Sequence, residues 1–319
     1  MLRCFCLALS ALTLTCWCRA QNVQIPRHYD VVKAENGLII GWQLASEDRG
    51  ARQIDVYDIK GTFLTGLAPL RLVPEAKRAT VYDVSALPGR IIAVGAVYRK
   101  SPDTVPAASL LYFDFQGDLL LALALDPSRE VVRLTVDGDS DVWTLTEGVG
   151  ERKPSEEPMA VGYSASGEVL KEVAKRSEFP ADASLTQGDD RMGSTGFGHS
   201  AGSVWFWLPS STELVTFKMH GSSQMSRFVT GLPKQSPREV VLSLLRTDAG
   251  VLLASVRGSE DDRSPGQFNF FSRSASRNHW EFYVPPCSQC SLIGVEGGKA
   301  FFLKDQGGQS EIYEAPVPE

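Results

Sequence analysis

A short pattern recurs along the chain and limits how it can fold: an aromatic residue, three further residues and a glycine. It returns at intervals of roughly fifty residues, as expected when one supersecondary unit is repeated. Glycine at the last position allows the positive φ angle that a tight turn between antiparallel strands requires. The complete copies run from Tyr57 to Gly61, Phe113 to Gly117, Tyr163 to Gly167 and Phe217 to Gly221, and a fifth copy from Phe271 has Ala275 in place of the glycine. The pattern therefore predicts a series of repeated hairpins.

Six compact apolar runs alternate with these turns, at residues 37–42, 90–94, 141–145, 203–207, 250–254 and 299–303. Short runs rich in β-branched and aromatic residues are typical of strands covered on both faces. Five of the runs follow a segment that is predicted to be the innermost strand of its unit: residues 30–33, 80–84, 131–136, 239–244 and 291–295. The glycine-rich residues 192–197 leave the sixth innermost strand undefined. Since no segment after residue 20 sustains a helical period, the chain is predicted to be all-β.

The number and length of the units indicate the architecture. Six four-stranded units of about 50 residues fill the chain after residue 20, which is typical of radial blades. With its strand, acidic turn and second strand at residues 136–145, the sequence resembles the six-bladed β-propellers, a superfamily with NHL-like and TolB-like members. The resemblance implies one propeller domain over residues 21–319, built from four-stranded antiparallel blades. It is a resemblance of fold, and fold does not decide function.

The two ends of the chain are predicted to share one blade. The last unit ends at Ile312 and Tyr313 without an outer strand, and residues 23–25 have no other evident role. We expect residues 23–25 to pair there and close the ring, because this removes an open sheet edge. Charged stretches, three of which contain proline, are expected between the second and third strands of their units, on one face of the disc where recognition is predicted: residues 46–52, 99–106, 148–158 and 258–265.

The first 20 residues have the pattern of a secretory signal peptide. Arg3 precedes an apolar run, and the small residues Cys18 and Ala20 stand before a predicted cut at Gln21. No later segment approaches the roughly 20 apolar residues of a membrane-spanning helix. We therefore expect an extracytoplasmic protein, periplasmic or secreted, with no membrane insertion after the signal is cleaved.

Net charge limits the partners. The formal net charge is −6, and cleavage of the signal peptide removes Arg3 and Arg19, which makes the exported chain more acidic. An acidic surface repels the phosphates of nucleic acids and anionic lipid headgroups. We expect no nucleic-acid partner and no cofactor, and we expect a monomer that engages another protein or a small ligand.

Only Cys287 and Cys290 remain after signal cleavage, in a Cys-x-x-Cys pattern that follows a proline pair. In an oxidising compartment the pattern favours a local disulfide between the two. A redox-active pair is the alternative, but its first cysteine usually stands at a helix N-terminus, and a strand is predicted after Cys290. A metal site would need two further ligands, and His279 is the nearest histidine.

Two other patterns resemble functional motifs. Ser200 stands in a Gly-x-Ser-x-Gly sequence, but a nucleophile elbow needs a helix after the serine, and an apolar strand is predicted here instead. We therefore interpret Ser200 as a turn residue. Asp137, Asp139 and Asp141 resemble the start of a calcium loop, yet the glycine and bidentate acid of that loop are missing. Acidic turns are common between strands, since the Asp side chains accept main-chain N–H groups.

Scattered candidates add little to these motifs. The four histidines, His28, His199, His220 and His279, never take metal-ligand spacing. The tryptophans, including Trp205 and Trp207, are interpreted as packing residues, with a ligand platform in the channel as the alternative.

Two function classes remain open. One is an exported binding or scaffold propeller that engages a protein or a small ligand through its loop face or its central channel. The other is a metal-dependent, lactonase-like hydrolase, as propellers also support. A hydrolase needs acidic or histidine side chains converging on the axis, whereas the candidates at the ends of the innermost strands are mixed in sign: Asp30, Asp83, Arg133 and Glu239. The mixed charges favour a binding protein over a metal-dependent hydrolase, and no catalytic residue is predicted.

The exported protein provides the test of the disulfide and of the cleavage site. We expect its intact mass to correspond to a chain that begins at Gln21, and we expect the denatured, non-reduced protein to contain no titratable thiol. Thiol titration that recovers both Cys287 and Cys290 without reductant would contradict the disulfide.

Overall fold

The computed structural model describes residues 23–101, 107–126, 129–148, 157–180, 185, 196–200, 202–209, 211–221, 224–231, 239–258, 267–274, 277, 279–306 and 309–318. The predicted signal peptide, residues 1–20, lies outside these ranges. Most of the stretches at residues 99–106, 148–158 and 258–265 also lie outside them, as does Ala275.

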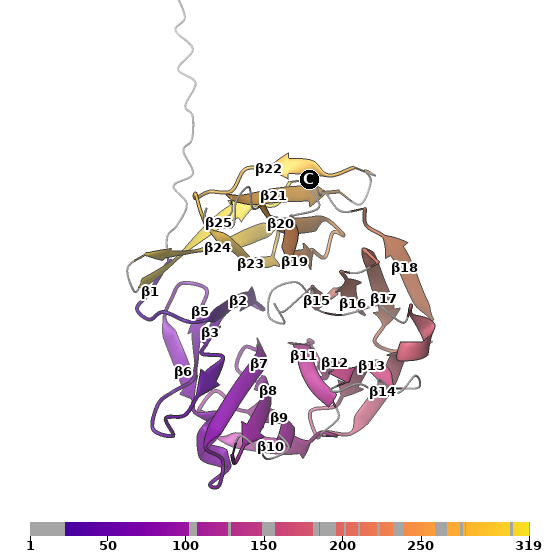
Figure 1. Ribbon diagram of the computed structural model, residues 1–319. Helices are drawn as coiled ribbons and strands as arrows, with labels where there is room; N and C mark the ends of the chain where they lie inside the picture. Colours follow the sequence, from indigo (N-terminus) through magenta and orange to yellow (C-terminus); the bar gives the residue numbers. More distant parts are fainter. Residues whose placement is uncertain are drawn as a thin grey trace, which may run out of the picture.

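Six small antiparallel sheets stand around a common centre, and the chain is a six-bladed β-propeller, as the repeat predicts (Figure 1). In the first five blades the strands follow the sequence from the innermost to the outermost. Blade 1 comprises β2 (Val31–Glu35), β3 (Leu38–Trp42), β5 (Ile54–Asp58) and β6 (Phe63–Leu67), and blade 2 comprises β7 (Arg78–Leu87), β8 (Ile91–Arg99), β9 (Ala107–Phe113) and β10 (Leu119–Ala124). Blade 3 comprises β11 (Arg129–Val136), β12 (Val142–Gly148), β13 (Pro158–Tyr163) and β14 (Val169–Lys175), and blade 4 comprises β15 (Phe197–Ser200), β16 (Ser203–Leu208), β17 (Glu213–Lys218) and β18 (Met225–Val229). Blade 5 comprises β19 (Val240–Arg246), β20 (Leu252–Gly258), β21 (Gln267–Arg273) and β22 (Glu281–Tyr283).

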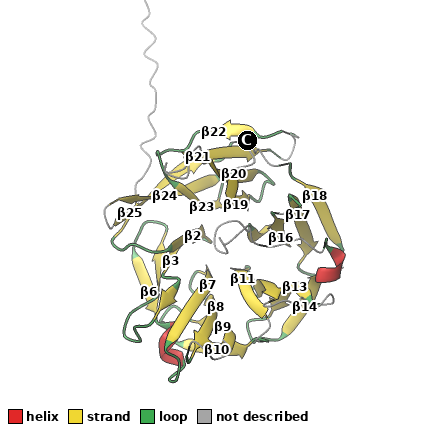
Figure 2. Ribbon diagram, in the orientation of Figure 1, coloured by secondary structure: helices red, strands yellow, loops and turns green. Residues whose placement is uncertain are grey.

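The described helical structure amounts to two short 3-10 turns, η1 (Pro69–Leu72) and η2 (Arg176–Glu178), so the fold is all-β as predicted (Figure 2).

The sixth blade contains both ends of the described chain. It comprises β23 (Ser291–Glu296), β24 (Lys299–Gln306), β25 (Gln309–Pro316) and, as its outer strand, β1 (Val23–Ile25). In the register of this antiparallel pair Val23 lies opposite Ile312, and Ile25 lies opposite Ser310. The predicted closure of the ring by residues 23–25 is confirmed.

The repeated glycines occupy the predicted turns between third and fourth strands. Their φ angles are 85° at Gly61, 88° at Gly117, 85° at Gly167 and 83° at Gly221, values that a residue with a Cβ rarely adopts. In blade 1 the carboxylate of Asp58 accepts the main-chain N–H groups of Lys60 and Thr62. Blade 2 repeats this arrangement around Asp114, so the turn chemistry recurs together with the spacing.

Two segments differ from the predictions. Ala45 and Ser46 form a short strand, β4 (Ala45–Ser46), which pairs with the inner edge of β7, although Ser46 was predicted to begin a loop. Ser200 is the last residue of β15 and pairs with Ser203, so the turn begins only after it. The sequence pointed to a turn because of its glycines. In the structure, a Cβ on Gly198 would lie 2.9 Å from the Trp205 ring, so this glycine makes room for packing within a strand.

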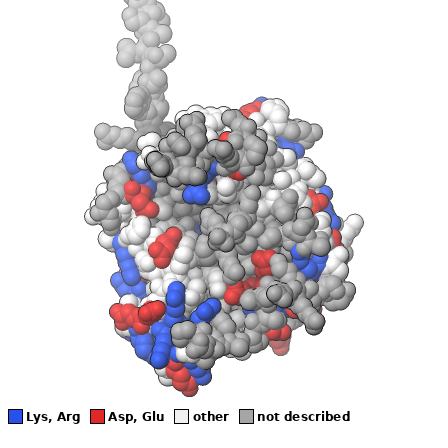
Figure 3. Space-filling model, viewed as in Figure 1, with Lys and Arg blue, Asp and Glu red and all other residues white. Residues whose placement is uncertain are grey.

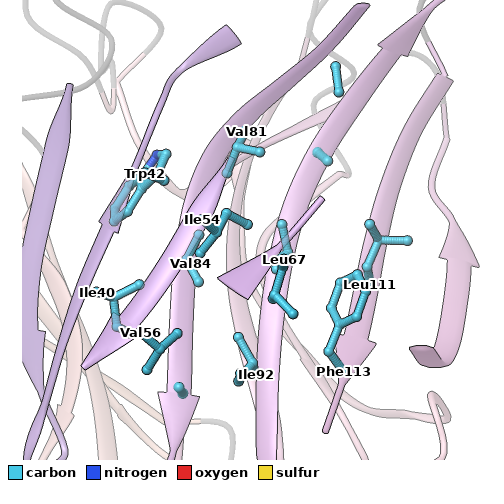
Figure 4. Close-up of a cluster of buried hydrophobic side chains, with 14 of the residues drawn as sticks. Ile40, Trp42, Ile54, Val56, Leu67, Val81, Val84, Ile92, Leu111 and Phe113 are labelled. Carbon is cyan, nitrogen blue, oxygen red and sulfur yellow. The ribbon is translucent and has the colours of Figure 1, made fainter. Parts of the chain in front are cut away.

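Apolar side chains fill the spaces between blades. Figure 4 shows the cluster that joins blades 1 and 2, in which Trp42 and Ile54 of blade 1 face Val81 and Ile92 of blade 2. Burying one such side chain contributes about 1.5–3 kcal/mol. These clusters make adjacent blades stabilise one another.

Closure of the ring is expected to depend on the inward side of β1. Ile25 is fully buried, whereas the adjacent Gln24 is exposed. We expect Ile25→Ala to lower the free energy of unfolding by about 2–4 kcal/mol because it leaves a cavity in the sixth blade. The control Gln24→Ala should change it by less than about 0.5 kcal/mol. Equal midpoints in urea for both variants would contradict a stabilising role for the closing strand.

Candidate functional site

The six innermost strands, β2, β7, β11, β15, β19 and β23, surround the centre of the ring and are called the hub here (Figure 1). Apart from the part of β7 that pairs with β4, these strands present open sheet edges, whose main-chain N–H and C=O groups need partners. Side chains of blade 2 provide partners for blade 3. The N–H of Leu134 donates to Oδ2 of Asp83 at 2.8 Å, and the N–H of Val136 donates to Oγ of Ser85 at 2.9 Å.

Blade 1 joins the hub in the same way. Oε1 of Glu35 accepts the N–H of Ala86 at 3.1 Å, and Nδ2 of Asn36 donates to the carbonyl of Ala86 at 2.9 Å. Blade 6 in turn binds blade 1, because Oε2 of Glu296 accepts the N–H of Gly37 at 2.7 Å. The hub carboxylates therefore connect neighbouring blades through main-chain groups.

Lys33 is the central cation of this network. Its ammonium lies 2.9 Å from Oε2 of Glu35 and 3.7 Å from Oδ2 of Asp83, and it donates to the carbonyl of Leu134 at 3.0 Å. Burial by itself would lower the pKa of Lys33, but the carboxylates of Asp83 and Glu35 outweigh burial, and the pKa is raised above its ordinary value. One lysine thus contacts groups from three consecutive blades.

A pocket of about 600 Å³ lies at one end of the hub. It is bordered by the turns that connect first and second strands, including Asn36, Ala249 and Gly297. Blades 1 and 3 contribute polar side chains, whereas blades 4 to 6 contribute large apolar side chains together with further polar ones. The first group comprises Lys33, Glu35, Asn36 and Thr135, and the apolar wall comprises Phe197, Trp205, Leu245, Ile293 and Val295. We call this cavity the hub pocket.

His199 joins the two sides of the hub pocket. Its Nδ1 lies 2.9 Å from the hydroxyl oxygen of Thr135, so a hydrogen bond links β15 of blade 4 to β11 of blade 3. Arg246, Asp248 and Glu296 add further charge to the lining. The pocket therefore offers groups of both signs together with an apolar wall.

Antiparallel strands place the first turns and the loops between second and third strands at opposite ends of a blade. The hub pocket consequently lies opposite the face where recognition was predicted. Since residues 102–106, 149–156 and 259–266 of that face fall outside the described chain, recognition there stays a prediction.

The structure separates the four predicted hub candidates. Asp83 and Arg133 lie in the hub, where both act electrostatically on Lys33. Asp30 is exposed and caps the N–H of Leu44 at 2.8 Å, while Glu239 is buried beside Gly258. None of the four candidates lines the hub pocket itself.

Lys33, Glu35, Asn36 and His199 were missed as pocket residues. The alternation of apolar Val32 and Ala34 with polar Lys33 and Glu35 was the available signal, and it continues beyond the predicted end of the strand at residue 33.

The acidic turn has the same design as the repeated hairpins. Oδ1 of Asp137 accepts the N–H groups of Asp139 and Asp141. Burial raises the pKa of Asp141, and the nearby charges of Asp137 and Asp139 raise it further. Among the residues that the structure describes, no three His, Cys, Asp or Glu side chains gather as a metal site. The turn's observed role is to cap main-chain groups.

Cys287 and Cys290 lie next to each other as separate thiols, the first half-buried and the second fully buried. Sγ of Cys290 is 2.9 Å from the carbonyl oxygen of Cys287. The hydrogen bond between the thiols raises the pKa of Cys287 and lowers that of Cys290. This proximity is compatible with the disulfide, which stays a prediction.

Comparisons with known proteins establish the fold alone. No protein-family model matches the chain, and no curated protein matches its sequence. Regucalcin from Agrobacterium tumefaciens, described as a calcium-binding protein, aligns with a TM-score of 0.51 and 12% identity over 93% of each chain. The GH74 enzyme of Niastella koreensis aligns with a TM-score of 0.51 and 10% identity, over 89% of this chain and 42% of that enzyme.

A periplasmic gluconolactonase from Pseudomonas aeruginosa aligns with a TM-score of 0.45 and 13% identity, over 92% of this chain and 89% of that one.

None of the helical segments in the described residues is long and apolar enough to cross a membrane.

Replacing Lys33 should test the hub network. We expect Lys33→Met to lower the free energy of unfolding by roughly 2–4 kcal/mol, because the carboxylates of Glu35 and Asp83 would lose their cation. The control Lys299→Met removes a more exposed pair, 2.5 Å from Glu314 with 55% of the lysine side chain accessible, and should cost less than about 1 kcal/mol.

Urea unfolding at several pH values would measure the effect. A lysine with a raised folded-state pKa stabilises the fold below its ordinary value of 10.5, and this contribution is lost as the pH rises through the folded-state pKa. The difference between wild type and Lys33→Met should therefore persist through neutral pH and shrink only in strong alkali. Equal losses for the two variants at neutral pH would contradict the network.

Proposed function

We propose that the protein is an exported binding propeller that takes a small ligand into the hub pocket. The observation that carries this proposal is the pocket itself. Its volume of about 600 Å³ falls within the range of roughly 300–1,000 Å³ that small-molecule sites occupy. An apolar wall with a few convergent polar groups is the usual composition of such sites.

The hydrogen bonds of the hub carboxylates favour binding over metal-dependent hydrolysis. Asp83, Glu35 and Glu296 each accept a main-chain N–H from a neighbouring blade. A catalytic metal would compete with these bonds for the same carboxylate oxygens. Ligand binding requires no such rearrangement, because the groups that line the pocket are already held in place.

The ligand is expected to carry both polar and apolar parts. Lys33 and Glu35 lie beside each other on the polar side, so their charges largely cancel within the pocket. On the face of the molecule seen in Figure 3, basic and acidic side chains are likewise interspersed. A neutral or zwitterionic ligand with an apolar portion suits such a lining better than a highly charged one.

Export is the second part of the proposal and rests on the pattern of residues 1–20. A binding protein outside the cytoplasm would meet nutrients, signals or cell-envelope partners directly. Engagement of a protein partner through the opposite face remains compatible with a small ligand in the hub.

A pocket-blocking variant provides the test. Ala249 is an exposed turn residue that borders the hub pocket, and Ala165 is an exposed turn residue in blade 3 outside its lining. A panel of sugars, lactones, amino acids and organic acids would be screened by thermal shift against wild type, Ala249→Trp and Ala165→Trp. We expect at least one compound to stabilise wild type and Ala165→Trp, by about 2.7 kcal/mol at a concentration of about 100 Kd, but not Ala249→Trp.

Two outcomes would contradict the proposal. In one, no compound stabilises the wild type, or the Ala249→Trp variant responds equally. In the other, a lactone from the panel is hydrolysed by the wild type, which would favour the enzymatic alternative.

A further inference from the structure

Arg246 is a half-buried guanidinium at the boundary between blades 4 and 5. It is the last residue of β19, and its Nη1 donates to the hydroxyl of Thr216, on β17 of blade 4, at 3.3 Å. Burial lowers the pKa of Arg246, although an arginine stays protonated near neutral pH. The side chain is therefore a fixed positive charge that has lost part of its hydration.

Arg246 forms no ion pair with any carboxylate that the structure describes. By contrast, Arg227 in blade 4 lies 2.8 Å from Oε2 of Glu213, and Arg129 in blade 3 lies 3.8 Å from Oε2 of Glu157. These two arginines thus have an acidic partner within the protein. A partly desolvated guanidinium without one is costly unless an anion compensates it.

A cleft of about 260 Å³ lies beside Arg246, between blades 4 and 5. Besides the two arginines Arg246 and Arg273, it is lined by the hydroxyl groups of Thr216, Ser226 and Ser274 and by the ring of Phe228. No Asp or Glu is among the described residues that line it. The lining is therefore rich in hydrogen-bond donors and carries positive charge only.

Arg273 is held rigidly at the side of this cleft. It is buried, its guanidinium stacks over the ring of Phe228 at 4.6 Å, and it donates to the main-chain carbonyls of Thr230 and Arg277. These contacts hold the guanidinium in place beside the cleft. The two guanidinium groups thus face the cleft from different strands, β19 and β21.

We propose that this cleft binds a small oxyanion, a carboxylate, sulfate or phosphate group, with Arg246 as its principal ligand. A guanidinium donates two parallel hydrogen bonds to such groups and is well suited to their geometry. Thr216, Ser226 and Ser274 add hydroxyl groups to the lining, and Arg273 lines the cleft from β21. The volume suits a single anionic group or a short acid rather than a large ligand.

The anion cleft adjoins the ligand site proposed for the hub, and Arg246 lines both. Ser226 and Leu252 line the cleft and not the hub pocket. Filling the cleft with Ser226→Leu should therefore abolish anion binding while leaving ligand binding in the hub intact. A variant such as Ala249→Trp, which is expected to lose ligand binding in the hub pocket, tests the proposed function and not the anion site.

Calorimetric titration with sodium phosphate, sodium sulfate and sodium citrate, at constant ionic strength maintained with chloride, tests the proposal. We expect saturable binding of at least one of these anions to the wild type, and a loss of about tenfold or more in Arg246→Gln. Arg246→Lys should retain part of the affinity, because it keeps the charge but loses the paired donors. The matched control is Arg227→Gln, the residue next to Ser226, which should bind as the wild type does.

The order of affinity among the three anions identifies the favoured chemistry, carboxylate or tetrahedral oxyanion. If Arg246→Gln does not fold, the side-chain Nε–H signals of 15N-arginine-labelled wild type and Ser226→Leu give the same information. One arginine signal should shift saturably with the anion in wild type and not in Ser226→Leu. The absence of saturable binding, or equal binding by wild type and the Arg246 or Ser226 variants, would overturn the proposal.

Discussion

The inner edges of the blades impose the constraint on which the rest of this propeller depends. Each blade is a sheet with two edges, and the edge at the centre has no neighbouring strand with which to pair, apart from the short β4 beside the start of β7. Unsatisfied main-chain groups there would cost free energy comparable to lost hydrogen bonds. Side chains of the preceding blade supply the missing partners. Asp83 and Ser85 accept main-chain N–H groups of blade 3. Glu35 and Asn36 form hydrogen bonds with main-chain groups of blade 2. Blades 6, 1, 2 and 3 are thus joined at the hub by cross-blade hydrogen bonds.

Much of the fold could be predicted because its signals are local. The turn glycines follow their aromatic residues at a constant distance, and a positive φ angle at Gly61 or Gly117 depends only on the hairpin that contains it. The closing strand could be inferred as well, since the last unit lacked an outer strand and residues 23–25 lacked a role. Ser200 was harder to interpret, because the glycine beside it reads as a turn although it makes room for Trp205.

The site could be predicted only in part, since its contacts join residues from different blades. Asp83 and Arg133 were among the candidates, but nothing in the sequence shows that Lys33 lies between Glu35 and Asp83. Whether a polar residue of an innermost strand faces the channel depends on register, and a bulge between residues 81 and 83 changes the alternation within β7. The sequence likewise does not show that Arg246 lacks an ion-pair partner, because this depends on where the three-dimensional fold places the carboxylates.

Joining β1 to β25 also constrains how the molecule reaches its native state. Individual blades are hairpin meanders whose contacts are local, so they can form early and independently. The last blade needs a strand from the beginning of the chain, and the loop that must close to bring it there is almost the whole protein. Until that happens, β25 presents an exposed edge that could pair with another molecule. The species most prone to aggregate is therefore an open ring with five complete blades and a three-stranded sixth blade. It persists until β1 pairs with β25 and completes that blade.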